Sequence, residues 1–530
     1  MLFTSYEFLA FIAVLFLLYY VIPKKFQWKL LLLASYLFYL ASGPENLLYI
    51  LFTTVTTYFL TKSIQKNKDA QSAYLKEHKQ EMSREERKEY KEGCKKKQWH
   101  LLIWCLVLNI GMLAVIKYTN FMISNINGVM GWFGSTRTLS FWDIALPMGI
   151  SFYVFKTMGY AIDVYRGKYP AEENPFKLAL FVSFFPQLVQ GPISRYDYIA
   201  ESLFEEHTFD GRTVSFGLQR ILWGFFKKLV IADRMLVAVN AIIGDTQTYR
   251  GAYVFLGMLF YALELYADFT GGIDITIGVS QVLGVKVEEN FIRPFFSKNI
   301  KEYWNRWHIT MGSWFTDYIF YPISVCQPML KLSRFSRKHL GEAIGKRVTV
   351  YLSCFVVWFA TGIWHGASWN FIVWGLANYV VIMVSQELEP FYRWFHSKVK
   401  VEGTFGFRLF QVVRTVLLMS ALRTFDCYRD VPLTFRMFGT IFTTWNWNEI
   451  FNGSLMGLGL GMADYVILFA GLVLLITVSL FGRSGSVREK IAAKPYAVRV
   501  AVWFGLFLIV ILLGNYGIGY DASQFIYNQF

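Results

Sequence analysis

Apolar runs long enough to cross a membrane recur along the whole chain, and they constrain its fold more than any other feature. A helix needs about 20 mostly apolar residues to span the hydrocarbon core of a bilayer. The clearest runs, some slightly shorter than this, are Leu9–Ile22, Trp99–Val115, Val348–Ile363, Tyr465–Phe481 and Val498–Leu513. With a composition that is 55% hydrophobic, they predict an all-α polytopic membrane protein with about ten to twelve spanning helices.

The excess of basic residues is explained by membrane topology, and we expect no nucleic-acid partner. The formal net charge is +15, and cytoplasmic loops of membrane proteins are enriched in Lys and Arg. Residues 62–98 are densely charged. We expect a cytoplasmic loop there, although a solvated helix with alternating charges fits the same pattern. Three predicted spans precede this segment, which places the N-terminus on the extracytoplasmic side of the plasma membrane.

We expect one integral-membrane domain over residues 1–530, because no flexible linker divides the chain. Its catalytic core is predicted within residues 140–385, where proline and glycine interrupt the apolar runs. The interruptions fall at Leu146-Pro147, Phe185-Pro186, Gly191-Pro192 and Asp268–Gly272. Broken helices at membrane depth are tolerated where they line a cavity or are buried in protein, so we predict that these segments surround a site.

His365 lies in the segment Thr361–Gly375, which is otherwise apolar and aromatic. A titratable side chain at membrane depth is costly and indicates a functional site by default. Histidine is also the side chain best suited to transfer protons near neutral pH. We therefore predict that His365 is a general base; a buried histidine that bonds a neighbouring carbonyl is the alternative.

His308 is the second histidine in dense aromatic sequence, and we predict one amphipathic helix around it. Asn299 is the expected N-cap, with Glu302 in the first turn. At helical spacing one face of this helix carries Trp304, Trp307, His308, Met311 and Phe315. The helix is too short and polar for an ordinary span, so we expect it at an interface or entering the membrane from one side. No third ligand accompanies the two histidines at a metal-binding spacing, and we predict no metal site.

Asp268 and Asp274 are carboxylates in an apolar stretch, so each needs a partner. One possibility is that they bond helix ends exposed by Gly271-Gly272. The other is that they orient a histidine or pair with Arg306.

Other catalytic templates are missing from the sequence. It contains no G-x-S-x-G elbow, no phosphate-binding loop and no dinucleotide fingerprint. Its five cysteines show no metal-binding or disulfide pattern. The chemistry is therefore expected to depend on the two histidines.

Several ordered blocks of the chain resemble the membrane-bound O-acyltransferase family. The blocks are Leu146–Tyr153, Asp163–Gly167, Phe185–Arg195, Asp268–Asp274, Asn290–Phe295, Tyr303–Thr310, Gly362–Trp369 and Phe525–Phe530. The resemblance is strongest to the bacterial branch that holds the alginate and peptidoglycan O-acetylation membrane subunits and the D-alanyl transfer protein of teichoic acid. After Tyr321-Pro-Ile this chain has Ser-Val-Cys, where alginate-type members usually have Gly-Gly, a difference that bears on the substrate.

The resemblance implies a ring of tilted helices around a central tunnel, with His365 as the catalytic histidine and His308 as the second histidine of the branch. Tryptophans would keep the tunnel narrow and dry. The further residues predicted to line it are Trp304, Trp307, Trp364, Asp268, Asp274 and Arg306.

The activity that the resemblance implies is O-acyl transfer across the membrane. The donor would be a cytoplasmic thioester, with acetyl-CoA as the expected substrate, and no bound cofactor is expected. Lys298, Lys301 or Arg306 could hold the phosphates of the donor. The acceptor would be an extracellular polysaccharide or cell-wall polymer, reached through an SGNH-hydrolase-type extracytoplasmic partner, and the remaining contacts would be to membrane lipid.

Two other functions fit parts of the same sequence. D-alanyl transfer to teichoic acid belongs to the same family branch. A transporter or flippase of an envelope precursor would also use broken helices and intramembrane carboxylates. A purely structural scaffold fits the two histidines least well.

Overall fold

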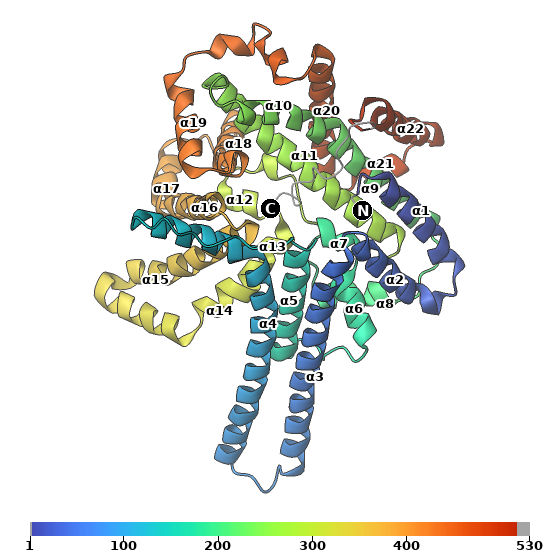
Figure 1. Cartoon of the computed structure of the whole chain (residues 1–530), viewed down its shortest axis with the longest axis vertical. Coiled ribbons are helices and arrows are strands. Elements are labelled where there is room, and N and C mark those ends of the chain that lie inside the picture. The colour runs from blue at the N-terminus through green and yellow to red at the C-terminus, as the bar shows by residue number, and fades with distance from the viewer. Residues whose placement is uncertain (1–2, 517–530) are drawn as a thin grey trace. The chain divides into compact units, whose positions relative to one another are not determined.

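The computed structural model describes residues 3–516, and helices form nearly all of its regular structure (Figure 1). Within this part of the chain no β-strand forms, and the extended pairing is limited to an isolated bridge between Phe291 and Trp307. The all-α prediction is confirmed. The block Phe525–Phe530 lies outside the described residues.

The chain divides into two compact units, and the single domain predicted over residues 1–530 stays a prediction. The first unit holds residues up to 214 together with 280–287. Its helices are α1 (Tyr6–Val21), α2 (Gln27–Leu40), α3 (Leu47–Glu77), α4 (Arg84–Trp132), α5 (Ile150–Arg166), α6 (Pro175–Ser183), α7 (Pro186–Val189) and α8 (Tyr196–Phe204). As predicted, the helices are interrupted beside Pro186, since α6 ends at Ser183 and α7 begins at Pro186, and again at Gly191-Pro192, after α7 ends at Val189.

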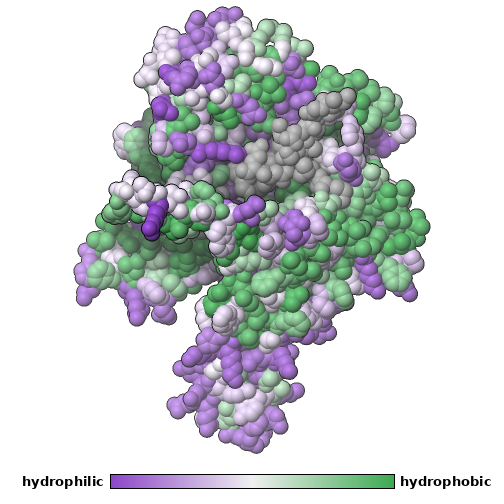
Figure 2. All heavy atoms as spheres, viewed as in Figure 1, coloured by the Kyte–Doolittle hydropathy of each residue, from purple (hydrophilic) through white to green (hydrophobic). Residues whose placement is uncertain are grey.

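Helices α3 and α4 form a long antiparallel hairpin whose tip is strongly hydrophilic (Figures 1 and 2). Residues 62–98 form the outer turns of both helices, joined by a short connection at 78–83. The charged sequence is helical because it consists of good helix formers, and Ser83 and Glu86 close a reciprocal capping box at the start of α4. The solvated-helix alternative is the correct one.

The second unit holds residues 215–279 and those from 288 onward. Its helices are α9 (Gly211–Phe225), a π-helical segment (Phe226–Ala232), α10 (Asp233–Gly244), α11 (Ala252–Val282), α12 (Ile300–Trp304), α13 (Ile309–Phe315), a second π-helical segment (Thr316–Phe320), α14 (Tyr321–Ser324), α15 (Gln327–His365), α16 (Trp369–Glu387), α17 (Glu389–Lys398), α18 (Phe405–Tyr428), α19 (Val431–Thr443), α20 (Met462–Phe481), α21 (Val487–Ala492) and α22 (Tyr496–Leu513). Helix α9 begins in the first unit, and α11 ends in it.

Seven of the described helical stretches are long and apolar enough to cross a membrane, or eight if the bent pair α16–α17 counts as one span. The seven include α3, α4, α11, α15, α18, α20 and α22. This number is lower than the ten to twelve spans predicted, because several apolar segments fold into shorter helices. One of them is α1, with 16 residues.

Helix α11 runs unbroken through Gly271-Gly272, contrary to the predicted interruption at Asp268–Gly272. The glycines are needed for close packing instead. A Cβ atom at Gly271 would lie 3.0 Å from the carbonyl oxygen of Gly224, and one at Gly278 would lie 2.8 Å from that of Gly217. Helix α9 therefore lies directly on α11, and this contact brings the charged side chains of both helices together.

Candidate functional site

His365 is the last residue of α15, and a tight connection leads from it to α16. The two helices approach closely because two glycines face each other's backbone. A Cβ atom at Gly362 would lie 2.7 Å from the Phe371 carbonyl oxygen, and one at Gly375 would lie 2.5 Å from that of Trp358. Larger residues there would push the helices apart, so the glycines fix the position of His365.

The connection after His365 is also held by side-chain hydrogen bonds. The Ser368 hydroxyl donates to Asn370 Oδ1 at 2.5 Å, and Asn370 Nδ2 donates to the carbonyl oxygen of Phe425 in α18 at 3.2 Å. Helix α18 is thereby tied to the histidine turn. The His365 ring is half-buried and packs edge-on against Trp364 and Trp374, with ring centroids 5.0 and 4.7 Å apart.

The predicted single helix around His308 is broken: α12 ends at Trp304, and His308 is the N-cap residue of α13. Its φ of 48° and ψ of 54° lie in the left-handed region, which is unusual for a residue with a side chain. The Asn299 cap is confirmed, since its side chain accepts from the Glu302 backbone N–H at 2.9 Å. The helix breaks because the backbone of 306–309 pairs with 290–292: Ile292 N–H donates to Arg306 O, and Ile309 N–H donates to Asn290 O.

Asn290 sets the protonation of the buried His308 ring. Its Oδ1 accepts from the Thr310 backbone N–H at 3.1 Å and lies 3.3 Å from His308 Nδ1. A backbone N–H can only donate, so this Asn290 atom is the carbonyl oxygen, and His308 Nδ1 must carry a proton to bond it. In the neutral ring Nε2 then has the lone pair and can accept a hydrogen bond.

The two histidines meet at the same tryptophan. The Trp364 ring lies 6.1 Å from that of His308 and 5.0 Å from that of His365. Trp304, the last residue of α12, has its ring centre 5.9 Å from that of Trp374. Trp307 is buried and forms the bridge to Phe291. The predicted histidines and their three tryptophans therefore belong to one cluster of the second unit.

Two cavities of the second unit reach this cluster at Trp304. One has a volume of about 570 Å³ and is lined by residues of α12, α13, the π-helical segment after it, and α15. The other has about 870 Å³ and extends to the start of α17 and the first turns of α18. Both cavities therefore border the cluster at Trp304, although the two histidines do not line either of them.

The chain matches the model of the membrane-bound O-acyltransferase family over residues 172–337. It is 30% identical over 481 residues to the "Probable alginate O-acetylase AlgI" of Pseudomonas syringae, an alignment that covers 89% of this chain and 81% of that protein. The chain belongs to the membrane-bound O-acyltransferase family. It is also 30% identical to the peptidoglycan O-acetyltransferase of Helicobacter pylori, over 57% of this chain and 58% of that protein.

A third relative is the teichoic acid D-alanyltransferase of Bacillus subtilis, 29% identical over 47% of this chain and 62% of that protein. Family membership and the apolar helices make this chain a multi-pass membrane protein and an O-acyltransferase. The family model ends before His365, whereas His308 lies inside it.

Within this O-acyltransferase, Asp268 is part of a buried charge cluster of α10, α11 and the first π-helical segment. Lys228 Nζ lies 2.6 Å from one carboxylate oxygen of Asp268 and 2.6 Å from one of Asp233. Glu264, one turn before Asp268, is also buried. Asp268 therefore neutralises a lysine, and it does not cap a helix end, because α11 continues past it.

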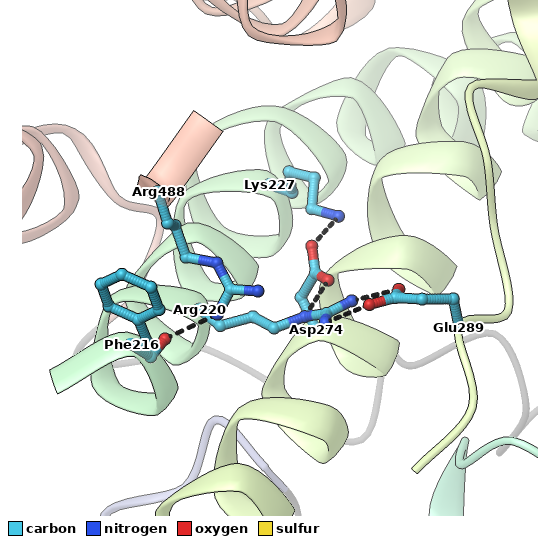
Figure 3. Close-up of polar contacts among 6 residues, drawn as sticks. All are labelled: Phe216, Arg220, Lys227, Asp274, Glu289 and Arg488. Atoms are coloured by element: carbon cyan, nitrogen blue, oxygen red, sulfur yellow. Dashed lines mark hydrogen bonds and ion pairs between the residues drawn. The ribbon is translucent and has the colours of Figure 1, made fainter. Parts of the chain in front are cut away.

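Asp274 belongs to a second charge cluster, drawn in Figure 3. Its carboxylate accepts from Arg220 Nε at 2.8 Å and lies 2.6 Å from Lys227 Nζ, while Arg220 also binds Glu289. The predicted alternative in which Arg306 pairs with either aspartate is wrong, because Arg306 Nη2 lies 2.5 Å from Glu302 Oε1 on the next turn. The π-helical turn explains why the adjacent Lys227 and Lys228 both reach α11.

Sequence reasoning missed an ion pair next to the histidines. Arg423 and Asp426 of α18 are both buried, and Arg423 Nη1 donates to Asp426 Oδ2 at 2.9 Å. The signal was present in the sequence: two charges three residues apart in an apolar span predict a buried pair. Burial, and then the charge of Arg423, lower the pKa of His308 to about 3, so His308 is neutral. Among residues 3–516 no three His, Cys, Asp or Glu side chains form a metal-binding group.

Proposed function

We propose that this membrane O-acyltransferase moves an acetyl group from a cytoplasmic thioester to hydroxyl groups of an extracellular polysaccharide or cell-wall polymer. One observation carries the proposal: two histidines, one with a fixed base-competent nitrogen, meet at Trp364 in a site built from tryptophans. The relatives named O-acetylase and O-acetyltransferase support acetyl as the acyl group.

His365 acts as the general base in this proposal. The acceptor oxygen attacks the thioester carbonyl carbon, a C–O bond forms, and the hydroxyl proton moves to the His365 imidazole. The tetrahedral oxyanion then collapses, the C–S bond breaks, and the proton passes from the imidazolium to the leaving thiolate. Products are an ester and a free thiol, and no other reactant is needed. General base catalysis of this kind contributes about 10²–10⁴-fold.

His308 orients the acceptor. Because its Nδ1 is protonated toward Asn290 Oδ1, its Nε2 is an acceptor and binds a second O–H or N–H of the acceptor. The alternative in which neutral His308 donates to the carbonyl oxygen fits this tautomer less well. Trp304, Trp307 and Trp364 exclude water, which would otherwise compete with the acceptor for the acyl group.

The larger cavity is a suitable entrance for a phosphate-bearing donor. Its lining includes the cations Lys298, Lys301 and Arg414, His396, and a single carboxylate, that of Glu389. Besides Trp304, it holds five aromatic rings against which an adenine base could stack: Phe391, Tyr392, Phe395, Phe407 and Phe410. Two of the three cations predicted for the phosphates are present, whereas Arg306 is replaced by Arg414.

This cavity is joined to the tryptophan cluster through Trp304, which lines it and packs on Trp374. A nucleotide thioester such as acetyl-CoA has a flexible arm between its phosphates and its sulfur, and in this proposal the arm leads from the cavity toward the histidines.

The remaining expectations complete the proposal. The cavity entrance and the charged hairpin of residues 62–98 would face the cytoplasm, with the N-terminus outside. An SGNH-hydrolase-type partner would pass the acyl group to the final polymer. D-alanyl transfer to teichoic acid is the second acyl-transfer reading, supported by the similarity to the teichoic acid D-alanyltransferase. A transporter or flippase has less support, because two histidines at one tryptophan, one of them with a defined tautomer, suit chemistry.

Mass spectrometry of envelope polymers from strains with and without the gene tests the activity. We expect base-labile acetyl esters to disappear from one polymer in the deletion strain and to return on complementation. D-alanyl esters that disappear instead would favour the second reading, and unchanged ester content would refute acyl transfer.

The donor entrance is tested with the purified chain in lipid vesicles, by thiol release from acetyl-CoA. We expect Lys301→Glu and Arg414→Glu to raise KM for acetyl-CoA strongly and to change kcat little, because they remove attraction for phosphate in the ground state. Arg436→Glu, an exposed position on α19, is the matched control. Equal KM values in all variants would place the donor elsewhere.

A further inference from the structure

The ion pair between Arg423 and Asp426 has no role in the steps above, although it lies beside the reacting groups. Both side chains are only 4% exposed. A guanidinium withdrawn from water is costly unless its charge and all of its N–H groups are compensated. Asp426 compensates the charge through one hydrogen bond from Nη1 at 2.9 Å.

Three tryptophans hold the guanidinium in place. Its central carbon lies 4.9 Å from the ring centre of Trp374, 5.0 Å from that of Trp307 and 5.7 Å from that of Trp304. A cation over an indole face is attracted by the ring quadrupole, more strongly when water is excluded. Trp374 in turn packs on the His365 ring at 4.7 Å. Arg423 is therefore fixed one aromatic ring away from the general base.

Several buried donors around this arginine lack a hydrogen-bond partner among the described residues. They are Arg423 Nε, the indole Nε1 of Trp374 and the indole Nε1 of Trp304. Buried N–H groups in native proteins are nearly always paired, and each exception needs an explanation. These three unpaired donors beside a base outnumber the one unpaired carboxylate oxygen of the pair, Asp426 Oδ1, and they indicate a ligand that brings oxygen atoms into the site.

We propose that Arg423 and Trp374 form the oxyanion site of the acyl transfer. This inference rests on the proposed function. When the acceptor oxygen attacks the thioester, the carbonyl oxygen becomes negatively charged, and the Arg423 Nε–H and Trp374 Nε1–H donate to it. The carbonyl double bond re-forms as the C–S bond breaks, and the negative charge leaves on the thiolate sulfur, so the donors bind the reacting oxygen most strongly at the transition state.

Asp426 is a positioning residue in this arrangement. Its bond to Nη1 turns the planar guanidinium so that the Nε edge stays available, and its charge keeps the pair neutral before the reaction. The division of roles also explains why neutral His308 is not needed as an oxygen donor and can orient the acceptor.

Two conservative variants test the proposal by thiol release from acetyl-CoA, with a polysaccharide acceptor present and the purified full-length chain in vesicles. Trp374→Phe keeps an aromatic ring and removes the N–H. Arg423→Lys keeps the charge and removes Nε–H. We expect each to lower kcat about 10²–10³-fold, the effect of losing one oxyanion donor, with KM for acetyl-CoA unchanged. Arg436→Gln, outside the site, is expected to match the unsubstituted chain.

The outcomes separate this inference from the proposed function. Wild-type kcat in Trp374→Phe and Arg423→Lys, with esters still formed in cells, would overturn the oxyanion site and leave acyl transfer intact. A rise in KM alone would also overturn it, because the contacts would then act on the ground state. No ester formation by the unsubstituted chain would refute the proposed function itself. If Arg423→Lys is not recovered folded, Trp374→Phe decides the question.

Discussion

Two buried polar regions of the second unit are built from similar residues but differ in how many oppositely charged groups face each other. In the region between α9 and α11, Lys228 and Asp268 are fully buried and lie 2.6 Å apart, and Lys227 lies equally close to Asp274. In the histidine region a single ion pair is surrounded by tryptophan rings, and the N–H groups of Trp304 and Trp374 lack partners among the described residues.

This difference indicates which region is structural and which one binds a substrate. Buried charges that neutralise each other hold helices together and offer little unpaired charge for a ligand to bind. Unpaired donors and a residue with unfavourable backbone angles are costly, and they persist where a ligand or a reaction uses them. The sequence alone could not separate the regions, because both present charged residues in apolar surroundings.

Replacing His365 with Ala is expected to have the largest effect on catalysis and none on folding. The rate of thiol release from acetyl-CoA should fall about 10²–10⁴-fold, since the proton acceptor is lost. The variant should remain monodisperse in detergent, because the half-buried ring carries little packing energy. His339→Ala, at an exposed position of α15, is the control. Full activity of His365→Ala would remove the base from the mechanism.

Replacing Asp268 with Asn is expected to show the opposite pattern. It leaves the buried Lys228 with one carboxylate fewer, and breaking a buried ion pair costs about 3–5 kcal/mol. The amount of folded protein and its thermal midpoint should drop, while the folded fraction keeps its kcat.

The double variant Lys228→Met with Asp268→Leu sharpens the same test. It removes both charges, so it should recover much of the lost stability. A stable Asp268→Asn protein with a greatly reduced kcat would instead indicate that Asp268 lines the substrate tunnel. The assignment of its region as structural would then be wrong.

Asn290 offers a finer test within the histidine region. Asn290→Leu removes the acceptor that fixes the His308 tautomer, so Nε2 no longer reliably carries the lone pair. We expect a loss in kcat/KM for the acceptor that approaches the loss in His308→Ala. Asn290→Asp keeps an acceptor at Oδ1 and should be clearly more active than Asn290→Leu. Equal activities of the two variants would show that the tautomer does not matter.

Much of this site was predictable because it depends on local sequence. The Asn299 cap follows from residue type and spacing, and both histidines were noticeable as costly groups in aromatic surroundings. The break at His308 was not predictable, since the amphipathic pattern continues through it. Backbone pairing of 306–309 with 290–292 overrides the local helical preference, and such pairing between separate segments has no local signature.

The ion-pair partners in the charge clusters could not be predicted from local sequence either. Asp268 and Asp274 required partners, but only the packing of α9 on α11 reveals that the partners are Lys228, Lys227 and Arg220. Gly271 was interpreted as a helix break, whereas it allows α9 to pack closely on α11. A glycine in an apolar helix permits either structure, and the neighbouring helix determines which one forms.

The pH dependence of the reaction gives the smallest but most specific prediction. His308 accepts a hydrogen bond only when neutral, and burial together with the Arg423 charge lowers its pKa to about 3. The activity should therefore lose no His308-dependent component as the pH falls from 7 to 5. Arg423→Gln removes one of the two causes, so the pKa rises part of the way toward the ordinary value near 6.5.

In Arg423→Gln, kcat/KM should accordingly begin to fall at a higher pH than in Arg423→Lys, which keeps the positive charge beside His308. Comparing the two variants cancels the loss of the Nε–H donor that they share, and only the electrostatic effect on His308 remains. Profiles of kcat/KM between pH 4 and pH 8 provide the measurement. Superimposable profiles would mean that Arg423 does not keep His308 neutral, and burial alone would then account for its state.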